Sequence, residues 1–201
     1  MTTVEREPLH PNPPLGLPPG SVRGLLSVMI VAELWLLLLL PRNPPQQVTV
    51  PVHIYMLLAL VLLFFAAHGR SIARKADPTP SPLYLPGGTL RLIILGGTIA
   101  TIVYLFINDR ERLIQRLTPS ADQIQHWPEF LLALAGGLVV GWIFRFIRPL
   151  HNWLAVLALF AMLADIVIEV FVYPQLKENA DPVVWQYIVT AVVASYFATR
   201  S

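Results

Sequence analysis

Three carboxylates stand inside long apolar stretches of this sequence. Glu33 lies in VAELWLLLLL (residues 31–40), and Asp165 and Glu169 lie in LADIVIEVF (163–171). The four-residue spacing of the last two places them on one face of a helix. A carboxylate at the centre of a bilayer costs about 2.5–3.5 kcal/mol, so it normally faces a bundle interior, a water-filled path or a partner. Together with His53, near the end of another apolar stretch, these residues could bind a cation or exchange a proton.

The same side chains have a simpler interpretation. Protonated or hydrogen-bonded between helices, they would only hold the helices together. Their depths are comparable in either case. At 1.5 Å per residue, Glu33, Asp165 and Glu169 lie roughly 10, 12 and 6 Å below the same membrane face. The sequence therefore predicts one polar layer, but the rotation of each helix about its axis is not readable from it.

The elements that must position these residues are apolar helices. Hydrophobic residues make up 55% of the 201 residues and charged residues 13%, with a mean hydropathy of +0.62. A soluble domain carries about 25% charged residues. Each apolar stretch is near the roughly 20 residues that cross a bilayer. We therefore predict an all-α integral membrane protein with six transmembrane helices, at about 22–40, 50–68, 90–107, 129–147, 151–173 and 183–199.

The segments outside the predicted helices indicate domains and orientation. Residues 1–20 contain six prolines and predict a disordered tail, followed by a transmembrane domain over 21–201. Residues 108–128 predict a short helical loop at the membrane interface, with the apolar side of DRERLIQRL opposite its arginines, followed by a second helix start at TPSADQ. Nine of the 14 lysines and arginines fall on the side of the N-terminus, which favours N-in and C-in in the cytoplasmic (inner) membrane.

A short repeat opens two of the predicted helices. LPPGSVRGLL (17–26) and LPGGTLRLII (85–94) share one frame, in which Ser21 or Thr89 could cap the helix. The repeat predicts two tandem helical hairpins followed by a third pair. The alternative is that both helix starts acquired the same chemistry independently.

Small residues mark the predicted packing faces. Gly137 and Gly141 form a G-x-x-x-G pattern, and Gly96 and Gly97 are adjacent in another helix. Such positions let helix backbones approach closely, either within one chain or between subunits.

Several classes of function lack their signatures. The chain has no cysteine, and we find no H-E-x-x-H, G-x-S-x-G, P-loop or Rossmann glycine pattern. We therefore predict no enzyme, no catalytic residue, no cofactor and no metal centre. A net charge of +2 with its basic residues at helix ends does not indicate nucleic-acid binding.

Two functions remain as hypotheses. The first is a structural or accessory subunit of a homo- or hetero-oligomeric membrane complex, whose partners are the lipid bilayer and copies of itself or other membrane subunits. Short loops and glycine-rich helix faces favour it. The alternative is a small oligomeric cation or proton channel or transporter that uses the intramembrane carboxylates.

Overall fold

In the computed structural model, the described part of the chain is 88% helix and has no strand, which confirms the all-α prediction. The structure describes residues 17, 18, 20–40, 49–72, 83, 85, 88–175 and 183–199, so most of the predicted tail lies outside the described residues. The helices are α1 (Ser21–Leu39), α2 (Val52–Ile72), α3 (Thr89–Asn108), α4 (Arg110–Leu117), α5 (Ala121–Gln125), α6 (Trp127–Phe144), α7 (Arg148–Val167) with its continuations η3 (Ile168–Val172) and η4 (Tyr173–Gln175), and α8 (Val183–Thr199).

Four helical segments are long and apolar enough to cross a membrane. They are α1, α3, α6 and the stretch Asn152–Gln175, which runs through α7, η3 and η4. The apolar parts of α2 and α8, Val52–Leu63 and Val183–Thr199, are helical as predicted but shorter. The described residues therefore support a membrane protein with four candidate spans.

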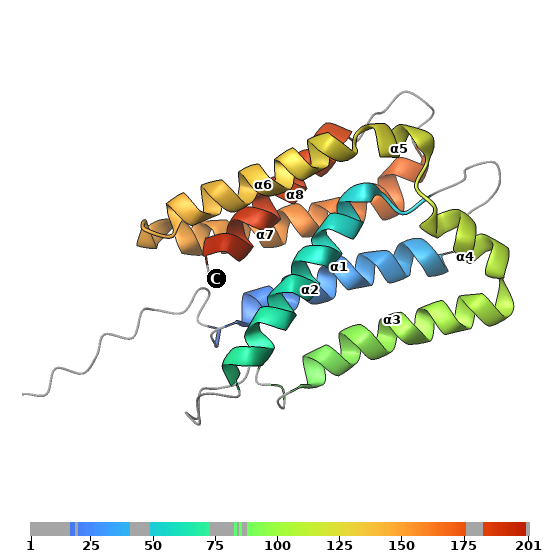
Figure 1. The fold of residues 1–201 in the computed structure, drawn as a ribbon, viewed down its shortest axis with the longest axis horizontal. Helices are drawn as coiled ribbons and strands as arrows, with labels where there is room; N and C mark the ends of the chain where they lie inside the picture. The colour runs from blue at the N-terminus through green and yellow to red at the C-terminus, as the bar shows by residue number, and fades with distance from the viewer. Residues whose placement is uncertain are drawn as a thin grey trace, which may run out of the picture.

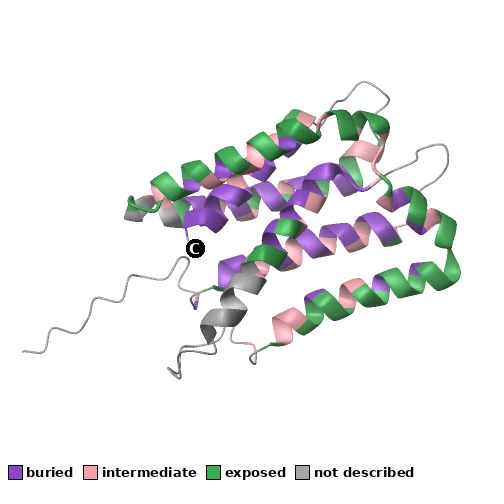
Figure 2. Ribbon diagram, in the orientation of Figure 1, coloured by how far each residue is buried: buried purple, intermediate pink, exposed green. Residues whose placement is uncertain are grey.

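The bundle has a buried interior and apolar outer faces. Helices α3 and α6 lie on opposite sides, with α1, α2, α7 and α8 between them (Figure 1). Leu26 and Ile30 of α1, Leu57 of α2 and Met162 of α7 are completely buried in one core. The outward faces of α3, α6 and α7 are instead exposed (Figure 2). An apolar face of this extent would be a liability in water and is what lipid covers in a bilayer.

Three of the four predicted packing glycines lie at close helix contacts. Gly137 and Gly141 of α6 face the backbone of α8, where a Cβ on Gly141 would lie only 2.8 Å from the Cβ of Ala198. Gly97 of α3 faces the indole of Trp35 in α1. Gly96 has open space around its Cα. The G-x-x-x-G pattern is therefore used within the chain, between α6 and α8.

The loop predicted over 108–128 forms two short helices, α4 and α5, capped by the side chains of Asp109 and Ser120. Its arginines do not lie where the sequence predicted. Arg116 is buried and donates from Nη1 to the carbonyls of residues 37 and 38 at 2.6 and 2.7 Å, and from Nη2 to that of residue 40 at 3.0 Å. The prediction that the arginines lie opposite the apolar side is wrong for Arg116, which is buried like Leu113, because the last carbonyls of α1 have no donor within their own helix.

The repeated helix start has a common backbone geometry. Gly20 before α1 and Gly88 before α3 hold the N-cap positions with φ of 86° and 92°. The prediction that Ser21 and Thr89 are the caps is therefore wrong by one residue. Glycine adopts this left-handed conformation without steric cost, which explains its recurrence in both copies.

Candidate functional site

A buried polar cluster lies at the end of the bundle where α1 ends and α2 begins. We define the carboxylate cluster as Glu33, His53, Asp165, Glu169, Trp185 and Gln186. The first four come from α1, α2, α7 and η3, and the last two from the first turn of α8. Trp185 is half-buried, and the other five residues are buried.

His53 and Asp165 form the best-ordered contact of the cluster. Nε2 of His53 lies 2.8 Å from Oδ2 of Asp165, and neither side chain has any exposed surface. The indole N–H of Trp185 donates to the other oxygen, Oδ1, at 3.0 Å. Both oxygens of Asp165 therefore have partners from different helices, and these partners fix the orientation of the carboxylate.

Glu33 is the exception in this cluster. It is completely buried, yet neither of its carboxylate oxygens has a hydrogen-bond partner among the described residues. Nδ1 of His53 is unpartnered in the same sense. Nearly all buried polar side-chain atoms in proteins have a partner, since an unsatisfied one costs about 1–3 kcal/mol and more when charged. An unpartnered carboxylate beside an unpartnered imidazole nitrogen therefore requires an explanation.

Glu169 lies where α7 changes its geometry. The N–H of Tyr173 bonds the carbonyl of Ile168, five residues back, so η3 is a π-helical turn. Such turns are rare and frequent at functional sites. Glu169 accepts a hydrogen bond of 2.6 Å from Nε2 of Gln186. The two carboxylates of this helix are thus bound by consecutive residues of α8.

Three possible ligand atoms converge in the cluster. One oxygen of Glu33, one nitrogen of His53 and one oxygen of Asp165 all lie within 4.8 Å of one another. No lysine or arginine among the described residues forms an ion pair with Glu33 or Asp165. Carboxylates and an imidazole in this arrangement can share a proton or hold a cation.

The sequence did not identify Trp185 and Gln186. They follow a segment without apolar periodicity, and a tryptophan at the start of an apolar stretch is typical of an interfacial anchor. Beside them, the ring of Phe130 in α6 stacks on His53 with centroids 6.4 Å apart. Tyr187 packs edge-on against Phe130 and donates its hydroxyl hydrogen to Glu129. These contacts bring α6 against the cluster.

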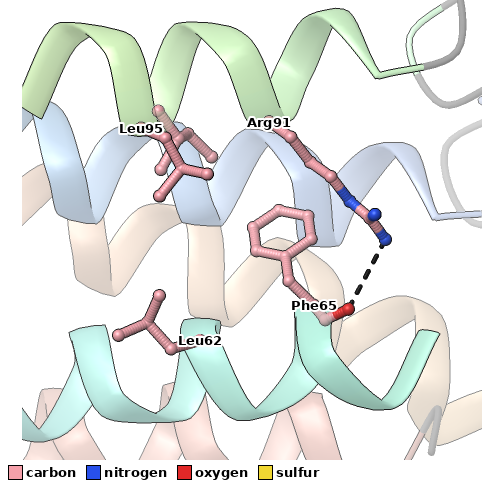
Figure 3. Close-up of a pocket in the computed structure, with 5 residues that line it drawn as sticks. Leu62, Phe65, Arg91 and Leu95 are labelled. Atoms are coloured by element: carbon pink, nitrogen blue, oxygen red, sulfur yellow. Dashed lines mark hydrogen bonds between the residues drawn. The ribbon is translucent and has the colours of Figure 1, made fainter. Parts of the chain in front are cut away.

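A separate pocket lies at the other end of α2. It has a volume of about 290 Å³ and is lined by Leu62, Phe65, Arg91, Ile94 and Leu95, between α2 and α3 (Figure 3). Arg91 lies over the Phe65 ring and donates weakly to the Phe65 carbonyl at 3.4 Å. Leu62 is nine residues from His53, or roughly 14 Å along the helix. This pocket is therefore not part of the carboxylate cluster.

The fold and the cluster together define a class: an all-helical protein with apolar helices suited to a membrane and ionisable residues in its interior. Comparison of the chain with protein-family models, curated proteins and solved structures finds no match. Functional assignment therefore depends on the chemistry of the cluster.

Proposed function

We propose that the protein is a polytopic integral membrane protein that binds and transports a cation or a proton at the carboxylate cluster. The observation that carries this proposal is the completely buried and unpartnered carboxylate of Glu33, beside His53 and Asp165. A purely structural polar contact would pair that carboxylate with a donor. A carboxylate that receives an ion instead needs free oxygen lone pairs.

The proposal includes the full predicted topology. In this topology α2 and α8 are shorter membrane helices that add to the four candidate spans. The protein lies in the cytoplasmic (inner) membrane with its N-terminus and C-terminus in the cytoplasm. In this orientation α1 and α7 run outward, and the cluster lies in the outer half of the bilayer. Several copies would form the complete transport unit.

The ion would pass along the cluster from its half-buried residue to its completely buried ones. Trp185 is half-buried and donates to the buried Asp165, so an ion that arrives from the outer side would meet Trp185 first. Asp165 and His53 would pass the ion or proton to Glu33. The role is not enzymatic, since it needs a site that binds and releases rather than a nucleophile.

Flux from proteoliposomes tests this function. We expect purified protein to carry protons or cations across the vesicle membrane, and Glu33→Gln to reduce the rate at least tenfold, because the amide keeps the volume and removes the charge. Glu111→Gln is the control, since Glu111 is an exposed carboxylate of α4 that is not part of the cluster. Full flux in Glu33→Gln, or no flux in the unaltered protein, would refute the proposal.

A second candidate function is the structural or accessory subunit. The observation that favours it is Gly96, which has nothing within 4 Å although it lies on an apolar face with exposed Leu92 and Ile99. A glycine inside a helix costs about 1 kcal/mol relative to alanine, and a helix from another subunit would compensate for this cost. Extraction from the native membrane in mild detergent distinguishes the two: other polypeptides at fixed ratio support the subunit, and a closed homo-oligomer supports the transporter.

A further inference from the structure

We infer that Glu33, His53 and Asp165 form a binding site for a divalent transition-metal ion of the Zn²⁺, Mn²⁺, Fe²⁺ or Co²⁺ class. The inference rests on the proposed function, because it names the cation that the same site receives. It departs from the prediction from sequence that the chain has no metal centre.

The ligand types select this class of ion. Imidazole nitrogen is a preferred ligand of zinc and its first-row neighbours, and carboxylate oxygens complete many such sites. Calcium and magnesium take oxygen ligands almost exclusively. A histidine whose Nε2 is 2.8 Å from a carboxylate oxygen, with a second carboxylate in reach, is a mixed nitrogen and oxygen donor set. That set favours a transition metal over an alkali or alkaline-earth ion.

The spacing of the donors fits with small adjustments. In a tetrahedral site with bonds of 2.0–2.1 Å, neighbouring ligand atoms lie roughly 3.3 Å apart. Here the His53 and Asp165 atoms are 2.8 Å apart, and all three donor atoms lie within 4.8 Å. Glu33 has no hydrogen bond to break, so moving its oxygen towards the other two donors sacrifices none. A metal would then replace the direct contact between His53 and Asp165.

The charge of the three ligand residues also fits a divalent ion. When both carboxylates are ionised and the imidazole is neutral, Glu33, Asp165 and His53 carry a charge of minus two, which one divalent cation neutralises; the third carboxylate of the cluster, Glu169, is bound by Gln186 instead. Without it, no lysine or arginine among the described residues neutralises Glu33 or Asp165. Such burial of uncompensated charge is among the most costly arrangements in a protein.

The neighbours of the site resemble the support that metal ligands usually have. Ligand carboxylates are commonly oriented by a hydrogen bond on their second oxygen. The indole N–H of Trp185 provides this bond to Oδ1 of Asp165 at 3.0 Å. Phe130 covers the ring of His53. Three protein ligands leave a fourth position open, which an ion in transit needs for exchange.

Cobalt binding to the full-length protein in nanodiscs tests the inference. After treatment with a chelator, we expect the protein to bind one Co²⁺ per chain with a visible absorption band, and Zn²⁺ to displace it. Glu33→Gln and His53→Gln should weaken the affinity at least tenfold while the helical circular-dichroism signal is retained. The matched control is His126→Gln, which alters the exposed histidine–carboxylate pair of His126 and Glu129 and should bind Co²⁺ unchanged.

X-ray absorption of the Zn²⁺-loaded unaltered protein tests the ligands directly and does not depend on whether a variant folds. Nitrogen and oxygen ligands scatter alike, but an imidazole ring adds a characteristic outer-shell signal, so one imidazole among the nitrogen and oxygen ligands of zinc is expected. If His126→Gln abolishes binding, or if zinc has two or more imidazole ligands, the inference is wrong.

The two proposals fail separately. If the unaltered protein binds no Co²⁺ or Zn²⁺ but carries protons in a manner that requires Glu33, the metal inference is overturned and the proposed function stands. If it binds the metal and carries nothing, the metal site stands and transport is refuted. If it does neither, both are wrong.

Discussion

Replacement of Gly137 by alanine tests the packing of α6 on α8. The added Cβ would lie 2.9 Å from both the Cα of Ala191 and the Cβ of Ala194. Carbon atoms without a bond between them are most stable at about 3.5–4.0 Å, so the helices would have to separate by roughly 0.6–1 Å. Overpacking of this kind costs about 1–3 kcal/mol.

Gly136 provides a matched control next to it on the same helix. Gly136 is exposed, and a Cβ there would meet nothing within 4 Å. Both substitutions gain about 1 kcal/mol from the higher helix propensity of alanine. That gain cancels in the comparison, so Gly137→Ala should unfold with a free energy about 1–3 kcal/mol lower than Gly136→Ala.

Unfolding in mixed detergent micelles, followed by far-ultraviolet circular dichroism, measures the difference. The comparison between the two variants is more informative than either against the unaltered protein, where the clash and the propensity gain partly offset each other. Equal stability of the variants, or a more stable Gly137→Ala, would mean that α6 and α8 are not in contact at this residue.

Two further predictions concern side chains that donate hydrogen bonds between helices. Arg116→Lys should lower the free energy of unfolding by about 1.5–3 kcal/mol in the same assay, because one ammonium cannot reproduce the bonds of the guanidinium fork to the end of α1; an unchanged value would contradict it. Trp185→Phe removes the hydrogen bond to Asp165 together with part of the ring and should weaken Co²⁺ binding about 10- to 100-fold, whereas Trp142→Phe, which removes the same atoms on the exposed face of α6, should not.

The level of the carboxylates along their helices could be predicted from the sequence, but the direction in which they point could not. Glu33 and Asp165 were predicted in one layer because residue counts along apolar stretches convert directly into distance. Whether they face one another depends on the rotation of α1 and α7, which neighbouring helices set. In a helix that is apolar on all sides, the hydrophobic periodicity does not indicate which face points into the bundle.

The residues that the sequence missed are donors whose acceptors lie far along the chain. Arg116 bonds carbonyls 76–79 residues before it, and an amphipathic reading of its own helix places it in solvent. Gln186 was indistinct from other polar residues at a helix start. The π-helical turn at Glu169 has no sequence signature here. The existence of the apolar helices was therefore local information, whereas the π-helical turn and the hydrogen-bond partners were not.

The two residues that lie beside Glu33 come from distant parts of the chain, which has a consequence for biosynthesis. His53 and Asp165 are 112 residues apart. At synthesis rates of about 5–20 residues per second, roughly 6–22 seconds separate their translation. During this interval α1 carries a carboxylate that α7 has not yet enclosed. A chain that stops before α7 would lack Asp165, so the carboxylate cluster can form only once most of the chain has been made.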